Sequence, residues 1–139
     1  MRWSEKRAIS FIRQIGVELQ HHKCPISGHK IILEDGEYKS IRWNNTTKTC
    51  ALDHDHSTGY MRGVLCEYAN MLLGPAEKGY YGILSPVIHN SSIVQTYYDN
   101  ASLESFKILH KSVYKKRNGS TTGYSNYLKQ KFEELGWNL

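Results

Sequence analysis

The chain has 139 residues, which is enough for one hydrophobic core and short for two. Hydrophobic residues make up 40% of it, which excludes disorder throughout, and no apolar run approaches the roughly 20 residues that a membrane-spanning helix needs. The net charge of +5 favours polyanionic partners such as nucleic acids.

The first predicted elements are a helix and a hairpin. The helix runs from Ser4 to about Gln20, because Ser4 is a suitable N-cap and apolar residues recur at spacings of three and four. A β-hairpin is predicted over residues 30–43, with Asp35-Gly36 as its turn. Residues 44–48 are polar and predict a loop.

The middle of the chain predicts a strand, a turn, a second strand and a short helix. The strands cover residues 49–54 and 60–65, and the turn between them is Ser57-Thr58-Gly59. The helix runs from Cys66 to Leu73, where Gly74-Pro75 is expected to end it.

The last part of the chain predicts mainly helix. Residues 80–89 are apolar but are interrupted by Gly and Pro. A helix capped by Asn100 or Ser102 is expected to continue to about Lys116, followed by a flexible linker over residues 116–123 and a helix over residues 124–135. One face of the longer helix would carry four apolar residues, Leu103, Phe106, Leu109 and Val113.

Four ionisable side chains stand in a row at residues 53–56, which read Asp-His-Asp-His. Burying such a run without partners would cost several kcal/mol for each charge, so it is exposed, paired or part of a site. Strict strand alternation places Asp53 and His54 on opposite faces, so they converge only where the strand bends or ends. An aspartate offers a hard oxygen ligand for Mg²⁺ or Mn²⁺, and a histidine is the natural general base near neutral pH.

Asn70 lies one helical turn after Cys66 and could add a second oxygen ligand. A cation with only two protein ligands keeps room for phosphate oxygens, which is what phosphodiester hydrolysis needs.

The segment 52–70 closely resembles the phage recombination endonuclease VII family, within the His-Me finger (ββα-metal, HNH-like) nucleases. It reads LDHDHSTGYMRGVLCEYAN. The family pattern is L-D-H-D-H, a turn ending in Gly, R-G-x-L-C, two residues and C-N. The resemblance implies an α+β fold in which residues 1–75 form the nuclease core with its N-terminal helix. Residues 76–139 would be a helical extension that binds DNA or dimerises.

The resemblance also implies a role for each matching residue. Asp53 and Asn70 would hold Mg²⁺ or Mn²⁺, and His54 would activate the water. His56 would contact the phosphate or orient the site, and Arg62 is a candidate phosphate contact. The alternative for Arg62 is a solvated or salt-bridged arginine.

Three lysines continue the predicted DNA contacts beyond the matching segment. Lys107, Lys111 and Lys115 are spaced i, i+4, i+8 on the predicted longer helix. Such a stripe is either an ordinary solvated face or a track for the DNA backbone.

The sequence departs from the family pattern at the structural zinc site. The family carries zinc on two C-x-x-C knuckles, but here these positions hold Cys24 with Ser27 and Cys66 with Ala69. Two thiols do not close a tetrahedral site, so we expect no structural zinc. An alternative recruits the nearby histidines as replacement ligands: His21, His22 and His29.

Three functions are compatible with these patterns. The first is a structure-selective DNA endonuclease that resolves junctions or removes branches, and the second is a duplex-nicking, homing or restriction-type HNH endonuclease. The third is a nucleic-acid-binding module with a vestigial nuclease site. The resemblance further implies a homodimer. The charged N-terminus lacks the apolar stretch of a signal peptide, so we expect a cytoplasmic protein, in the host cytoplasm if a phage encodes it.

Overall fold

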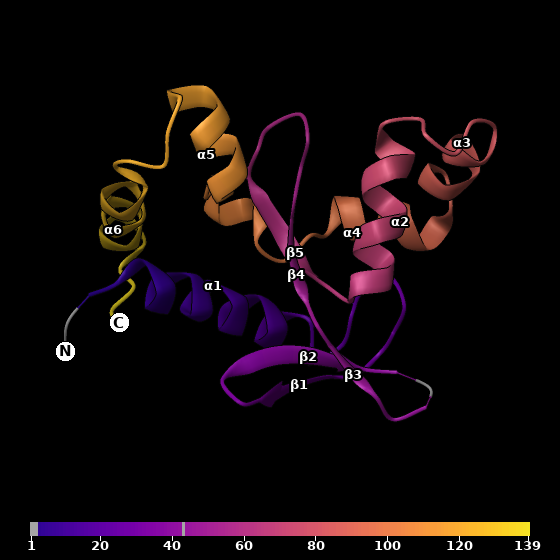
Figure 1. The fold of residues 1–139 in the computed structure, drawn as a ribbon, viewed down its shortest axis with the longest axis horizontal. Helices are drawn as coiled ribbons and strands as arrows, with labels where there is room; N and C mark the ends of the chain where they lie inside the picture. The colour runs from indigo at the N-terminus through magenta and orange to yellow at the C-terminus, as the bar shows by residue number, and fades with distance from the viewer. Residues whose placement is uncertain (1–2, 43) are drawn as a thin grey trace.

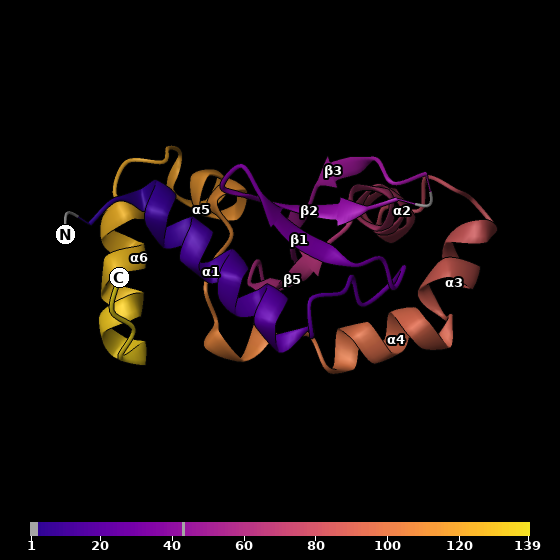
Figure 2. The same cartoon turned by 90° about the horizontal axis from the view of Figure 1, so that it is seen from below.

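The structure is a computed structural model that describes residues 3–42 and 44–139. Two small antiparallel sheets and several helices give the α+β fold that the sequence predicts (Figures 1 and 2). One continuous cluster of buried side chains draws on residues from Ala8 to Phe132. Trp43, the last residue of the predicted hairpin, lies outside the described residues.

Helix α1 (Glu5–Leu19) confirms the first predicted helix and its cap, because the Ser4 hydroxyl accepts the Arg7 N–H at 3.2 Å. It packs against strand β5 (Met61–Leu65) and helix α6 (Tyr124–Leu135). The amide of Gln20 then bonds both backbone groups of Val64 at 2.8 Å each. The end of α1 is therefore attached directly to the most buried strand.

The first sheet has the order β1 (Ile31–Glu34), β2 (Glu37–Ile41) and β3 (Thr47–Thr49). The predicted hairpin is confirmed, with Asp35 and Gly36 both at positive φ, as a tight two-residue turn requires. The predicted loop over residues 44–48 is wrong at its end, because β3 pairs with β2 there. This strand is short and polar, so it has no alternating pattern to reveal it.

The second sheet consists of β4 (Ala51–His54) and β5, and helix α2 (Glu67–Glu77) follows it. The predicted end of this helix at Gly74-Pro75 is wrong, because α2 continues for two residues beyond Pro75. Proline cannot donate the hydrogen bond to the carbonyl of Met71. That carbonyl accepts the Tyr81 hydroxyl at 3.5 Å instead.

Two further helices follow where the sequence predicts only an interrupted apolar stretch: α3 (Leu84–His89) and α4 (Ser92–Asp99). Helix α3 contacts both α2 and α4, and Figure 1 shows α3 and α4 at the end of the molecule away from the two termini. Helix α4 is capped by the Ser91 hydroxyl, which accepts the Val94 N–H.

The predicted helix from residue 100 to 116 is wrong. A 3₁₀ turn, η1 (Glu104–Phe106), ends at Lys107, whose φ of 54° is left-handed, and α5 (Lys111–Asn118) begins only after three extended residues. Lys107, Lys111 and Lys115 therefore do not share one helix face, and residues 116–118 belong to a helix instead of a linker. The last predicted helix is confirmed as α6 (Tyr124–Leu135). Within the described ranges, no helix is long and apolar enough to cross a membrane.

Candidate active site

A pocket of about 560 Å³ lies beside the β4–β5 hairpin and collects most of the predicted site residues. Asp53 and His54 reach it from β4, His56 from the loop after β4, and Asn70 from α2. Its wall is completed by other residues from the same helix and from distant segments, including Arg13, Met71, Lys78, Tyr80 and His110. The sequence predicts the first four residues, and the fold brings them together.

An irregularity in the hairpin lets two adjacent residues reach one pocket. Asp53 lies opposite Gly63, but His54 lies opposite Met61, so Arg62 is an extra residue on β5. A bulge of this kind bends the strand and turns its side chains. Asp53 and His54 consequently both line the pocket, although strict alternation would separate them.

Asp53 is a buried carboxylate with two strong hydrogen bonds on one oxygen. Its exposed fraction is 6%, and its Oδ2 accepts Arg62 Nε at 2.6 Å and the Tyr97 hydroxyl at 2.7 Å. Both bonds use the same oxygen, so Oδ1 is the one that they leave for another ligand. A carboxylate held in this way has a fixed direction, which a metal ligand needs.

Of the two roles that the sequence leaves open for Arg62, its surroundings agree with a salt-bridged arginine. It is 6% exposed, and its second nitrogen donates to Glu77 Oε1 while its guanidinium lies 4.6 Å from the ring centre of Tyr98. Burial alone would lower the pKa of Arg62, but the hydrogen bonds and charges of Asp53 and Glu77 outweigh burial and raise it. Arg62 is thus a buried cation that joins two carboxylates, and this position does not present it to a DNA backbone.

His54 is half-buried and contacts two other imidazoles. Its ring centre lies 5.0 Å from that of His56 and 4.6 Å from that of His110. Burial lowers the pKa of His54, and the neighbouring His56 lowers it further. The ring is therefore neutral at pH 7 and able to accept a proton.

His56 lies at the rim of the pocket, with 37% of its side chain exposed. Its Nε2 is 3.3 Å from Glu77 Oε2, so Glu77 contacts both His56 and Arg62. The neighbouring Asp55 has a different function, because its Oδ1 accepts the Ser57 N–H and hydroxyl and shapes the turn. Partial burial alone would raise the pKa of Asp55, but the hydrogen bonds from this turn outweigh it and lower the pKa.

The pocket offers a small set of hard ligands. Among the described residues, no group of three or more His, Cys, Asp or Glu side chains is arranged to hold a metal ion. Asp53 and Asn70, a carboxylate and an amide, both line the pocket. Such a set suits Mg²⁺, which takes few protein ligands and keeps several waters or substrate oxygens.

The three predicted DNA-contacting lysines occupy different environments. Lys107 is exposed after η1, and Lys115 is exposed on α5. Lys111 forms an ion pair with Glu5 at 2.5 Å. Lys115 is followed by Lys116 and Arg117, so the basic surface of this segment lies at the end of α5.

The two knuckles of the predicted zinc remnant do lie together. Cys24 and Cys66 are each 1% exposed and carry free thiols. The Cys66 N–H donates to Cys24 Sγ at 3.4 Å, and the Cys66 thiol lies 3.3 Å from Ser27 Oγ. Hydrogen bonding to Cys66 lowers the pKa of the Cys24 thiol. Ala69, at the fourth position, is fully buried, whereas His21 and His22 are exposed.

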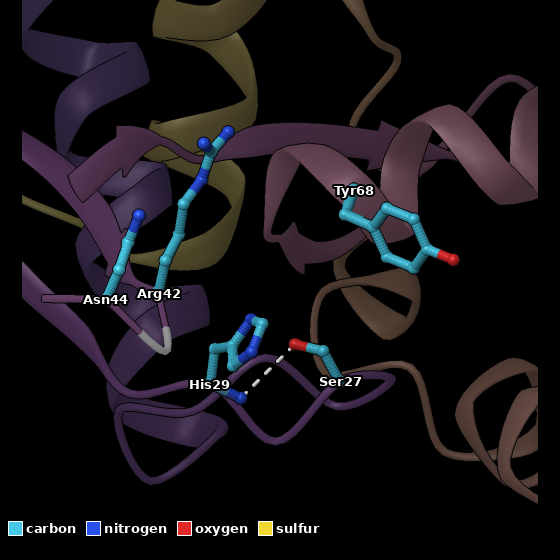
Figure 3. A pocket seen from close by; sticks show the side chains of 5 residues that line it. All are labelled: Ser27, His29, Arg42, Asn44 and Tyr68. Carbon is cyan, nitrogen blue, oxygen red and sulfur yellow. Dashed lines mark hydrogen bonds between the residues drawn. The ribbon is translucent and has the colours of Figure 1, made fainter. Parts of the chain in front are cut away.

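A larger pocket, of about 710 Å³, lies beside these knuckles (Figure 3). The described residues that line it come from three segments: Ser27, His29, Arg42, Asn44 and Tyr68. In Figure 3 the Ser27 hydroxyl accepts the His29 N–H at 3.2 Å, which fixes the knuckle turn. These residues include no carboxylate, so the smaller pocket is the better candidate for hydrolytic chemistry.

Sequence reasoning missed four residues that contact the predicted ones: Glu77, Tyr97, Tyr98 and His110. Glu77 falls beyond the predicted end of its helix, and the other three come from segments that carry no motif. Their only sequence signal is their type, since tyrosine and histidine combine an apolar ring with a polar atom.

A family model described as recombination endonuclease VII matches residues 13–89, which is more than half of the chain. This span includes both knuckles, the β4–β5 hairpin, α2 and α3, and it ends before α4. No curated protein and no solved structure matches the chain.

Proposed function

The chain belongs to the recombination endonuclease VII family, and on this basis we propose that it is a metal-dependent DNA endonuclease selective for branched DNA, such as four-way junctions. Family membership implies that the chain is an endonuclease. The observation that supports the chemistry is the convergence of Asp53, His54 and Asn70 on one pocket.

In this proposal Asp53 and Asn70 hold Mg²⁺ or Mn²⁺, within a ββα-metal arrangement of β4, β5 and α2. The bound cation would neutralise charge on the scissile phosphate and the leaving oxygen. His54 accepts the proton of the attacking water, because burial keeps its imidazole neutral. His56, exposed at the rim and oriented by Glu77, contacts the phosphate.

The supporting residues hold this arrangement without touching the substrate. Tyr97 and Arg62 fix the direction of the Asp53 carboxylate, and Glu77 connects Arg62 to His56. Because Arg62 carries a positive charge, it also balances two carboxylates in a buried environment. We assign it to positioning instead of to phosphate binding.

The test is cleavage of matched DNA substrates by the purified chain with Mg²⁺. We expect four-way junctions and flaps to be cut far faster than linear duplex, and excess EDTA to stop the reaction. His54→Ala should lower the rate by about 10² to 10⁴, the usual contribution of a general base, and leave DNA binding intact. His21→Ala removes an exposed histidine distant from the pocket lining and serves as the matched control.

Each other outcome selects a different function. Equal cutting of linear duplex and junctions would favour the duplex-nicking, homing or restriction-type enzyme. Tight DNA binding with no cutting in Mg²⁺ or Mn²⁺ would favour the vestigial binding module. Full activity of the His54→Ala protein would refute the assigned chemistry.

We also propose a homodimer that associates through the region around α3. Residues 79–98 contain no Asp, Glu, Lys or Arg. Three side chains of this region, Ile83, Leu84 and Val87, are 57–89% exposed. Large exposed apolar patches mark interaction surfaces, and an uncharged one meets its own copy without repulsion. Light scattering should give a molar mass twice the 16.0 kDa of one chain. Ile83→Glu should reduce that mass to the value for a single chain.

We propose that hydrogen bonds and packing, instead of zinc, join the first knuckle to α2. Cys24, Ser27 and Cys66 form a hydrogen-bonded group, and Ala69 fills the fourth position. Elemental analysis of protein purified without chelators should find less than one zinc per chain. One tightly bound zinc would refute this and would favour the alternative with His21, His22 or His29 as ligands.

A further inference from the structure

A segment far along the chain adds a short third edge to the β4–β5 hairpin. The Met61 N–H donates to the Ile108 carbonyl at 2.8 Å, and the His110 N–H donates to the Gly59 carbonyl at 3.0 Å. Ile108 is 1% exposed, so it anchors the segment in the core. The left-handed backbone at Lys107 ends η1 and turns the chain into this extended path.

This path delivers His110 to the candidate active site. Its Nδ1 accepts the Ser112 N–H at 3.1 Å as the N-cap of α5, and it lies 2.8 Å from the Ser112 hydroxyl. Both interactions fix the plane of the ring. The ring lines the pocket, and its centre lies 4.6 Å from that of His54 with an angle of 32° between the planes.

We infer that His110 is a positioning residue that holds the His54 imidazole in the orientation needed for proton transfer. This inference rests on the proposed function, since it takes His54 as the general base. His110 lies outside residues 13–89, so the match to the family does not include it. Through it, the C-terminal part of the chain completes the site.

The physical reason is that a general base must be placed to within a few tenths of an ångström. His54 stands at the end of β4, next to the bulge, where the sheet itself restrains it least. Its ring is about half-buried and contacts two rings, one of which, His56, is in an exposed loop position. His110, held by its hydrogen bonds to Ser112, is the more restrained of the two contacts. Misplacement of a reacting group by about 1 Å can cost about a hundredfold in rate.

Two substitutions separate the ring contact from the helix cap. His110→Phe keeps an aromatic ring beside His54 and loses the cap, whereas His110→Asn keeps a good N-cap and loses the ring. We expect His110→Asn to lower kcat about 10-fold to 100-fold with KM unchanged, and His110→Phe, which keeps the ring but loses the hydrogen bonds that fix its plane, to lower kcat less. If His110 acted only as a helix cap, the order would reverse: full activity in His110→Asn, or equal loss in both, would overturn the inference.

A second measurement does not depend on cleavage. Side-chain NMR relaxation of the His54 ring, assigned by its absence in His54→Ala, reports motion on the ps–ns timescale. We expect an ordered ring in the original chain and a more mobile one in His110→Asn, with His110→Phe between the two. An equally ordered ring in His110→Asn would overturn the inference. If neither the original chain nor any variant cleaves DNA, the proposed function is refuted. The relaxation measurement still decides whether His110 orders the His54 ring.

Discussion

Residues 53–77 and residues 97–110 meet at the same pocket but contribute in different ways. The first segment supplies the groups that face the pocket from the hairpin and α2. The second supplies supports: Tyr97 bonds the Asp53 carboxylate, and His110 packs against His54. One segment carries reactive groups, and the other fixes where they point.

The two segments also differ in how burial is compensated. In the first, Arg62 is buried between Asp53 and Glu77 and offsets one of their two negative charges through short hydrogen bonds. In the second, Tyr97 and His110 contact Asp53 and His54 without adding a charge, while Glu104 lies with Arg62 and Glu77 in a neighbouring pocket. A site built in this way should tolerate loss of a support better than loss of a member of the charged group.

The largest effect is expected from removing the central cation. Arg62→Met leaves Asp53 and Glu77 buried without their partner, and breaking a buried ion pair from one side costs about 3–5 kcal/mol. Urea unfolding measures this loss. Arg42→Met is the matched control, because Arg42 pairs with Glu67 at 3.3 Å where both side chains are 42% exposed. Exposed pairs contribute under about 1 kcal/mol, so equal losses in the two variants would contradict the comparison.

The next effect tests the contact between the two segments. A Cβ at residue 63 would lie 2.8 Å from the Tyr97 hydroxyl oxygen and 3.0 Å from Gln20 Oε1. Gly63→Ala must therefore displace Tyr97 from Asp53, at a cost of about 3 kcal/mol in the free energy of unfolding.

Gly74→Ala provides the control for this glycine, since a Cβ there meets open space within α2. Alanine is the better helix former, so we expect a gain of about 0.5–1 kcal/mol. Thermal unfolding of both variants measures these changes in stability. An unchanged stability in Gly63→Ala would mean that the close contact between Tyr97 and β5 does not contribute to the free energy of unfolding.

The sequence predicts the first segment well and the second poorly, for a physical reason. Asp53, His54 and Asn70 are recognisable because reactive chemistry restricts residue type and spacing together. The hairpin and the first and last helices are recognisable from periodicity and turn residues. Supports such as Tyr97 are defined by a contact 44 residues away, which no local pattern records.

The wrong secondary-structure predictions also arise from contacts between residues that are distant in the sequence. Apolar spacing over residues 100–116 suits a helix, but Ile108 pairs with the edge of β5 and is buried there, so tertiary contacts outweigh local preference. Likewise, α2 continues past Pro75, and the Met71 carbonyl accepts the Tyr81 hydroxyl there. For Arg62 the motif gives the position of the residue but not its burial, so the sequence leaves open whether it contacts a phosphate or forms a salt bridge.

A smaller effect should appear on acidification. Burial, and then the neighbouring His54, lower the pKa of His110 to about 4 from an ordinary 6.5. Between these values the unfolded chain binds a proton at this ring that the folded protein does not, so stability falls as the pH drops from 6.5 towards 4. Allowing for solvent screening of a partly exposed ring, we expect this group to contribute about 2 kcal/mol of that loss.

His110→Phe removes the titrating group while keeping a ring, so it isolates this contribution. Urea unfolding at pH 7 and about pH 4.5 should give a smaller difference for His110→Phe than for the original chain. Parallel stability curves would mean that His110 is equally basic in the folded and unfolded states. That result would place the ring in solvent instead of in the wall of the pocket.

The smallest effect concerns contacts with the DNA backbone outside the pocket. Helix α5 starts directly after His110 and ends with Lys115 and Lys116 exposed, so a backbone held at the pocket can follow it. Replacing both lysines by glutamine should weaken DNA binding roughly fivefold and reduce the slope of log K against log salt by about 0.9 for each phosphate that is no longer neutralised. The control pair, Lys30→Gln with Lys129→Gln, removes the same charge at exposed positions elsewhere and should leave the slope almost unchanged. An equal change in both pairs would mean that net charge alone attracts the DNA, and the second segment would then position His54 without guiding the substrate.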